Sequence, residues 1–139
     1  SNSADVFVAA SRLVSYGVEP RLIYNEINNG KPFSTRKLLG VLLQKAERYL
    51  DGRLVITYES LEDTKRYGIE GRDSDALYQL LLSSEGVEAA VFLRQDTPST
   101  CSGEFRSQDK IDVSVVASKL GGDRQKNASG MCILLRIIF

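Results

Sequence analysis

The sequence predicts an α/β fold, in which a mixed β-sheet is flanked by helices and preceded by an N-terminal helical segment with a connecting helix. Two observations lead to this prediction. Apolar residues recur at helical spacing through the first fifty positions, whereas from residue 53 onward short β-branched and aromatic stretches alternate with helical ones. The chain is therefore expected to have two parts, a helical segment over residues 1–50 and a sheet domain over residues 53–139.

The first part is expected to contain three helices, over residues 3–16, 19–28 and 34–50. Gly17 ends the first helix, and Pro20 suits the opening of the second because proline fits the first turn of a helix. The third helix carries the broadest apolar stripe, and Asp51-Gly52 is expected to end it.

The second part is expected to alternate strands with helices. The stretch "RLVITY" is rich in β-branched and aromatic residues and predicts the first strand, while the "DTPST" turn joins two later strands as a hairpin. Ser60, Asp73 or Ser74, and Asp112 are the expected helix N-caps. The expected strands cover 53–58, 87–95, 101–108 and 131–139, and the expected helices cover 60–68, 73–86, where Gly86 ends the helix, and 112–120.

The charge balance argues against a polyanion that is attracted by the overall charge of the chain. Eighteen basic and eighteen acidic residues cancel, so no overall field attracts a polyanion, and a phosphate site must come from a local group of donors. The two cysteines, Cys101 and Cys132, match neither a disulfide framework nor a zinc motif. They are expected to be small core residues in a reducing compartment.

The absence of histidine narrows the chemistry further. Hydrolysis by a Ser-His or Cys-His pair is excluded within this chain, and a metal site would need clustered carboxylates. The acidic residues instead fall where helix caps and solvated helix faces are expected. We therefore expect no catalytic residue, metal ligand or cofactor in this chain. No stretch has the apolar length of a membrane span and no signal-type sequence opens the chain, so a cytoplasmic location is expected.

The glycine-opened, cation-rich segment "ASKLGGDRQKNASG" at 117–130 has two interpretations. Gly121-Gly122 can end a helix, and Arg124 and Lys126 then complement the negative end of the helix dipole. Alternatively, the glycines let backbone N–H groups approach a phosphate closely, and the neighbouring side chains add further donors.

Arg106 and Ser107 end a strand that leads, through the expected Asp112-capped helix, to this segment. A guanidinium fork and a hydroxyl at that place could meet the loop across the edge of the sheet and bind the same phosphate. The alternative is that Arg106 is an exposed strand cation paired with Glu104 or Asp109, which would contribute little. The residues alone leave both interpretations open.

The stretch "FRSQDKIDVSVVASKLGGDRQKNASG" at 105–130 resembles the signature of the DHH-associated C-terminal domain. In that domain a strand ending in Arg-Ser leads through an Ile/Val-Asp-Val-Ser helix start to a glycine-rich loop and then to Asn-Ala-Ala/Ser-Gly. Upstream, residues 11–27, 37–58 and 83–95 resemble the end of the catalytic DHH domain, the connecting helix and the first part of the C-terminal domain. The family is that of the DHH phosphoesterases, in particular the oligoribonuclease and 3′-phosphoadenosine-5′-phosphate phosphatase branch, also described as exopolyphosphatase-related.

The resemblance implies a division of labour between two domains. In the family, Asp and His residues of the DHH domain hold a manganese pair that activates a water, and the C-terminal domain closes over the cleft to bind the substrate's phosphate and base. This chain would then be the substrate-binding part of a longer metal-dependent hydrolase that acts on short oligonucleotides or nucleoside bisphosphates. Manganese and catalysis would belong to the missing DHH domain, and the chain alone is expected to be inactive.

The resemblance assigns substrate binding to the strand end and the loop. The expected binding residues are Arg106, Ser107, Gly121, Gly122, Arg124, Gln125, Lys126 and Asn127. Where the family usually continues Gly-Gly-His, this sequence has Asp123, Arg124 and Gln125. Asp123 places a negative charge next to any phosphate, and Gln125 can donate a hydrogen bond but cannot titrate. A weakened or changed substrate preference is therefore expected.

A second hypothesis is that these replacements have inactivated the site, so that the domain is now a regulatory or protein-interaction module. Intact DHH-type metal ligands upstream would favour the enzyme, and their loss would favour the module. A further expectation concerns residues 3–50, whose apolar stripes would pack on the missing domain or pair with another copy of the chain as a homodimer.

Overall fold

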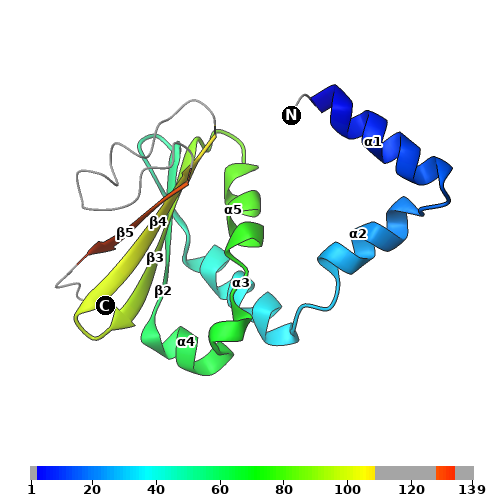
Figure 1. The fold of residues 1–139 in the computed structure, drawn as a ribbon. Coiled ribbons are helices and arrows are strands. Elements are labelled where there is room, and N and C mark those ends of the chain that lie inside the picture. Colours follow the sequence, from blue (N-terminus) through cyan, green and yellow to red (C-terminus); the bar gives the residue numbers. More distant parts are fainter. Residues whose placement is uncertain (1–2, 109–127, 134–139) are drawn as a thin grey trace. The chain divides into compact units, whose positions relative to one another are not determined.

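The computed structural model describes residues 3–108 and 128–133 (Figure 1). The chain forms two compact units, one that ends at Pro32 and one that begins at Phe33. In the described ranges, no helix is both long enough and apolar enough to cross a lipid bilayer.

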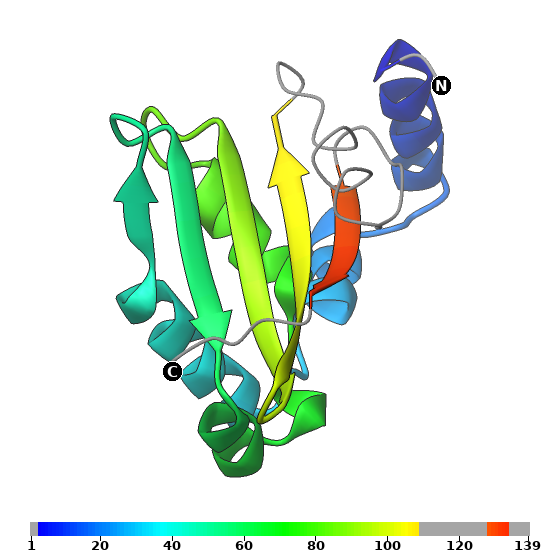
Figure 2. The same ribbon diagram turned by 90° about the vertical axis from the view of Figure 1, so that its left-hand side faces the viewer.

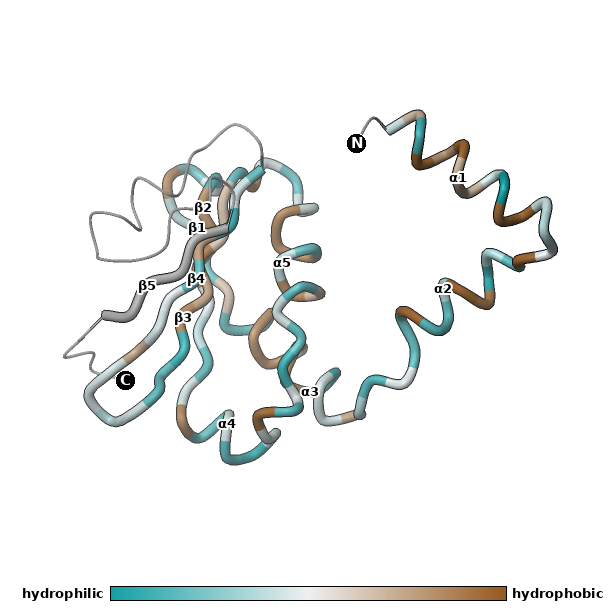
Figure 3. Tube along the Cα trace, in the orientation of Figure 1, coloured by the Kyte–Doolittle hydropathy of each residue, from teal (hydrophilic) through white to brown (hydrophobic). Residues whose placement is uncertain are grey.

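The described residues of the N-terminal unit form two helices, α1 (Ser3–Ser15) and α2 (Pro20–Asn28), close to their expected bounds. Pro20 is the first residue of α2, and Gly17 between the helices has a φ of +88°, a conformation that favours glycine. Within α1 and α2 no residue is buried, although both helices carry strongly hydrophobic positions (Figure 3). The exposed large apolar side chains are Val6, Phe7, Val8, Leu13, Val14, Leu22, Ile23, Tyr24 and Ile27.

In its described residues, the second unit contains a five-stranded sheet with helices. Its elements are α3 (Phe33–Lys45), β1 (Glu47–Tyr49), β2 (Leu54–Glu59), α4 (Leu61–Tyr67), the 3-10 helix η1 (Ile69–Gly71), α5 (Ser74–Leu82), β3 (Ala89–Thr97), β4 (Thr100–Ser107) and β5 (Ala128–Ile133). The described strands lie in the order β1-β2-β3-β4-β5. Strands β2 and β3 are parallel, and the other neighbours are antiparallel. This confirms the predicted α/β class with a mixed sheet.

Helices α3, α4 and α5 lie on one face of the sheet (Figures 1 and 2). Successive side chains of a strand alternate between the two faces, which explains why Val55, Thr57 and Glu59 of β2 are buried while Ile56 and Tyr58 are not. The core between helices and sheet consists of Leu38, Leu42, Val55, Leu77, Tyr78, Leu81, Val87, Ala90 and Phe92. Each fully buried leucine contributes roughly 1.5–3 kcal/mol to folding.

One expected helix is shorter than the sequence suggested. Helix α3 ends at Lys45 rather than at residue 50, and Glu47–Tyr49 form β1 instead, antiparallel to β2. The turn that follows β1 explains the difference. Leu50 and Asp51 have φ values of 53° and 57°, and Gly52 follows at 84°. Successive left-handed residues match the twist of two antiparallel strands and cannot belong to a right-handed helix.

Two predicted helix caps are confirmed. At the start of α4, Ser60 Oγ accepts a hydrogen bond from the Asp63 backbone N–H (3.2 Å), and Asp63 Oδ2 accepts one from the Ser60 N–H (3.0 Å). Lys45 also donates to Asp63. At the start of α5, Asp73 Oδ1 accepts from the Ala76 N–H at 3.2 Å. These bonds fix both α-helices of the connection between the parallel strands.

The last described strand begins earlier than expected. Residues 128–130, which the sequence analysis placed in the loop, pair with Arg106, Phe105 and Glu104 as the first half of β5. Pairing with a neighbouring strand therefore overrides the small and polar composition of this stretch. The helix expected over 112–120 and the strand positions 134–139 lie outside the described residues.

Candidate functional site

Arg106 lies at the end of β4, where the sequence analysis expects phosphate binding. The sheet register pairs Arg106 with Ala90 of β3 on one side and with Ala128 of β5 on the other. Its backbone is therefore held by strands on both sides, which fixes the point from which the side chain leaves.

The Arg106 side chain points to the helix-covered face and contacts α5. Its Nη1 donates a hydrogen bond to Oδ1 of Asp75 at 2.7 Å, and the guanidinium carbon lies 4.5 Å from the centroid of the Tyr78 ring. The side chain of Arg106 is 31% exposed and that of Asp75 is 84% exposed. The guanidinium thus rests on an aromatic face, binds one carboxylate and still reaches solvent.

Tyr78 is a fixed support under this guanidinium. The residue is buried, and its hydroxyl donates a hydrogen bond to the backbone oxygen of Glu104 at 2.8 Å. Burial, and secondarily the negative charge of Glu104, raises the pKa of Tyr78 well above its ordinary value. The phenol therefore remains protonated and keeps its hydrogen bond to β4 at neutral pH.

Ser107 does not share a face of the sheet with Arg106. Successive side chains of a strand point to opposite faces, and Arg106 takes the face that carries α5. Ser107 is buried, paired in the sheet with Ala89. The structure therefore places these two predicted binding residues side by side in the backbone but sends their side chains in different directions.

The remaining predicted binding residues lie between the two described ranges. Gly121, Gly122, Arg124, Gln125, Lys126 and Asn127 belong to the segment 109–127, outside the described residues. The positions that flank this segment belong to the described ranges. The Gln108 N–H donates to the Glu88 oxygen at 3.0 Å, and the Gln108 Nε2 donates to the Leu82 oxygen at 2.6 Å. On the other side, Ala128 begins β5 next to Arg106.

Sequence reasoning missed a second charged cluster, at the carboxyl end of β2. The Glu59 side chain is fully buried, and its Oε2 accepts a hydrogen bond from Arg72 Nε at 2.8 Å. Arg72 Nη2 also donates to Thr64 Oγ1 at 3.3 Å. Among the described residues, Glu59 Oε1 has no hydrogen-bond partner. The signal in the sequence was an acidic residue at an inward-facing strand position.

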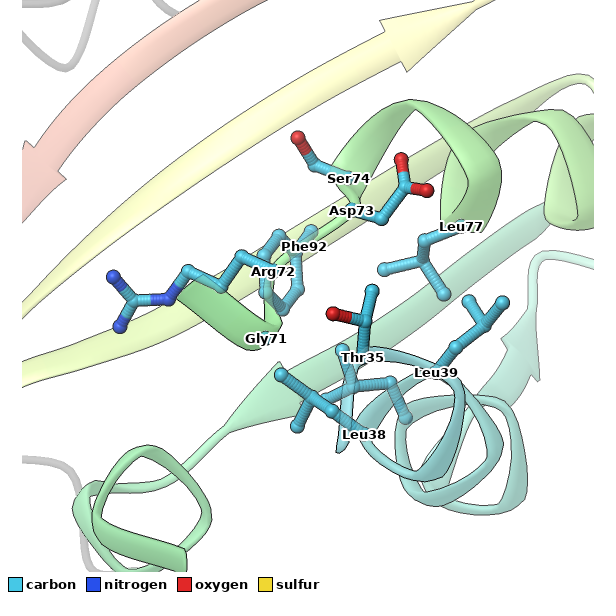
Figure 4. A pocket seen from close by; sticks show the side chains of 10 residues that line it. Thr35, Leu38, Leu39, Gly71, Arg72, Asp73, Ser74, Leu77 and Phe92 are labelled. Carbon is cyan, nitrogen blue, oxygen red and sulfur yellow. The ribbon is translucent and has the colours of Figure 1, made fainter. Parts of the chain in front are cut away.

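A small cavity lies between α3, the start of α5 and β3 (Figure 4). Its volume of about 10 Å³ has room for one water molecule at most. Half of its lining residues are large and apolar, namely Leu38, Leu39, Leu42, Leu77 and Phe92, and the Arg72 guanidinium points away from these leucines (Figure 4). The cavity is a packing gap and cannot hold a nucleotide.

The described residues do not fit a manganese pair. Within them, no three His, Cys, Asp or Glu side chains come close enough together to hold a metal ion. The buried carboxylate of Glu59 is already bonded to a guanidinium, which is the opposite of a cation site. The metal that the family resemblance implies has no ligand set in this part of the chain.

Comparisons with known proteins identify the fold. No protein-family model matches the sequence, and no curated protein is significantly similar to it. An exopolyphosphatase-related protein from Bacteroides fragilis has a similar structure, with a TM-score of 0.84 and 24% identity, over 99% of this chain and 40% of that chain. A pGpG-specific phosphodiesterase from Vibrio cholerae matches with a TM-score of 0.53 and 14% identity, over 73% of this chain and 35% of that chain. The described chain therefore has the fold of a part of these longer proteins.

Proposed function

We propose that this chain is the substrate-binding domain of a metal-dependent phosphoesterase that hydrolyses short oligonucleotides or nucleoside bisphosphates. The observation that carries the proposal is the position of Arg106. Its guanidinium is partly exposed at the end of the sheet, and its backbone pairs with Ala128, which directly follows the segment 109–127. The expected phosphate donors from Gly121 to Asn127 immediately precede Ala128 in the chain.

The chemistry of Arg106 suits a phosphate. A guanidinium offers a planar fork of N–H donors that matches two phosphate oxygens, and such charge-assisted hydrogen bonds are about twice as strong as neutral ones. The Tyr78 ring holds the plane of the fork from one side. Because the whole chain has no net charge, a fixed local cation of this kind is what phosphate binding requires.

The similar structures support the same class of substrate. One is called exopolyphosphatase-related and the other a pGpG-specific phosphodiesterase, so both names refer to reactions at phosphate groups. This chain covers 40% and 35% of those two proteins. We accordingly assign catalysis and manganese to a further domain of a longer protein, and binding to this chain.

The test is a titration of the chain with a 5′-phosphorylated dinucleotide at low salt, in which the backbone amide chemical shifts are recorded at each addition of ligand. We expect saturable shifts at Arg106, Ser107 and residues 121–127. Arg106→Ala should weaken binding about 10- to 100-fold, because it removes a charge-assisted hydrogen bond worth about 1.5–3 kcal/mol.

The matched control is Arg94→Ala. Arg94 is also a strand arginine paired with an aspartate, since its Nε lies 3.4 Å from Asp96 Oδ1, but it pairs in the sheet with Ser102, well along the strands from Arg106. This variant should bind like the wild type. Equal affinity of wild type and Arg106→Ala would contradict the assignment of Arg106. No binding by the wild type would favour the alternative, a regulatory or protein-interaction module.

A further inference from the structure

Arg106 already has an anionic partner in the structure, and that partner is placed to compete with a ligand. Asp75 Oδ1 accepts the hydrogen bond from Arg106 Nη1 at 2.7 Å. A phosphate that binds the Nη1–Nη2 edge of the guanidinium in the two-pronged way would use Nη1, the nitrogen that already donates to Asp75.

Asp75 can leave Arg106 without disturbing the fold. It belongs to the first turn of α5, but the cap of that helix is Asp73, whose Oδ1 accepts from the Ala76 N–H. The Asp75 side chain is 84% exposed, so its carboxylate is readily hydrated when it rotates away. The Tyr78 ring, by contrast, is held by its bond to Glu104 and keeps Arg106 in position whichever anion it binds.

We propose that Asp75 is an internal competitor for the ligand phosphate: it occupies Arg106 in the free protein and lowers the affinity of the site. This inference rests on the proposed function, because it requires that Arg106 binds phosphate. It makes Asp75 a residue that sets affinity, although nothing in the sequence connects position 75 with position 106.

The test compares wild type and Asp75→Asn in the full chain, titrated with inorganic phosphate and with a 5′-phosphorylated dinucleotide. The asparagine keeps the size of the side chain and removes its charge. Exposed ion pairs stabilise by a few tenths of a kcal/mol to about 1 kcal/mol, so Asp75→Asn should tighten binding about two- to fivefold. Asp75→Glu keeps the carboxylate and should bind like the wild type.

Two controls separate local competition from general electrostatics. Asp96→Asn removes a carboxylate from the comparable Arg94 pair and should leave the affinity unchanged. In the Arg106→Ala background, Asp75→Asn should no longer tighten binding. Equal tightening with and without Arg106 would overturn the proposal, because the effect would then be one of net charge.

The outcomes also separate this proposal from the proposed function. If Arg106→Ala weakens binding but Asp75→Asn leaves it unchanged, only the competitor is refuted. Weaker binding by Asp75→Asn would likewise refute it and would make Asp75 a residue that orients Arg106. If neither wild type nor Asp75→Asn binds either probe, both proposals are refuted. A similar unfolding midpoint for wild type and Asp75→Asn would show that any change in affinity does not come from a damaged fold.

Discussion

Glu59 shows how one buried charge joins several elements. Its carboxylate comes from the end of β2, and Arg72, which bonds to it, lies beyond η1 and also bonds to Thr64 of α4. Removing one partner of a buried pair leaves an uncompensated charge, whereas removing both leaves an apolar site. The stability of this region should therefore depend on the pair as a unit.

Arg72→Leu should lower the free energy of unfolding by about 3–5 kcal/mol, as expected when a buried carboxylate loses its partner. The double variant Glu59→Leu/Arg72→Leu should recover most of that loss. Urea unfolding measures both. The control is Arg66→Leu, whose pair with Glu62 is mostly exposed and which should change stability by less than about 1 kcal/mol. A double variant as unstable as Arg72→Leu would show that the two charges are not coupled.

Asp63 predicts a dependence of stability on pH. Partial burial works against its charge, but hydrogen bonds from Lys45 and Ser60 outweigh it and hold the pKa of Asp63 below its ordinary value of 3.8. A lowered folded-state pKa gives stability that is present above 3.8 and is lost as the pH falls through the folded value. Asp63→Asn should be less stable than wild type by about 1 kcal/mol at pH 6.

The pH dependence is measured by urea unfolding of both proteins at pH 6 and at pH 3. The difference in the free energy of unfolding between wild type and Asp63→Asn should shrink at pH 3, because below 3.8 the unfolded chain takes up the proton more readily than the folded chain and the stabilising effect of the charge falls. Ser60→Ala removes the other half of the capping box and should destabilise the chain at both values. A difference that stays constant with pH would contradict the role of the charge.

At the level of elements, the turn between β1 and β2 depends on Gly52. Its φ of 84° favours glycine, and a Cβ there would lie 2.9 Å from Arg48 Nη2. Gly52→Ala should therefore lower the free energy of unfolding by about 1–2 kcal/mol. Gly40→Ala is the control, because a Cβ in the middle of α3 meets no atom within 4 Å and should raise stability by about 0.5–1 kcal/mol. The midpoints of thermal unfolding of the two variants should shift in opposite directions relative to wild type. A higher midpoint for Gly52→Ala would contradict the claim that this turn depends on glycine.

Elements with local signals could be predicted, and those that depend on distant partners could not. Ser60 and Asp63 lie three residues apart and mark the start of α4, and "DTPST" correctly placed the β3–β4 turn. Strand β1 has three residues and exists only through its register with β2. The Asp51-Gly52 dipeptide was a hairpin signal, but the helical stripe before it favoured a helix end.

The candidate site follows the same rule. Arg106 at a strand end could be expected from the sequence, but its partner could not, because the expected Glu104 and Asp109 are neighbours whereas Asp75 lies 31 positions away. Glu59 and Arg72 escaped notice for a similar reason, since only the connection between β2 and β3 brings them together. Contacts across elements are not encoded in local spacing.

At the scale of the whole molecule, the two units differ in how many of their helical residues are buried. Helices α1 and α2 bury no residue within their own range, whereas Leu38 and Leu42 of α3 belong to the core of the second unit. The sequence suggested a division near residue 50. That residues 53–139 form a domain of their own stays a prediction. The burial of α3 makes the position of the boundary testable.

A chain that begins at Phe33 should unfold cooperatively, with a midpoint close to that of the second unit in the full chain. A chain that begins at Arg53 should not fold cooperatively, because it lacks two buried leucines, and each leucine-to-alanine change in a core already costs about 2–5 kcal/mol. Circular dichroism on heating measures both. Cooperative unfolding of the shorter chain would place the boundary near residue 50 instead.

The parallel pairing of β2 with β3 sets the order in which the sheet can assemble. Strands β3 and β4 are joined by two residues, Pro98 and Ser99, and such hairpins form in about 1–10 μs. Strand β2 can join β3 only after the whole connection from Ser60 to Glu88 has closed, which costs more chain entropy. Because folding slows as contacts become more distant in sequence, we expect the β3–β4 hairpin to form early and β2 to dock onto it late.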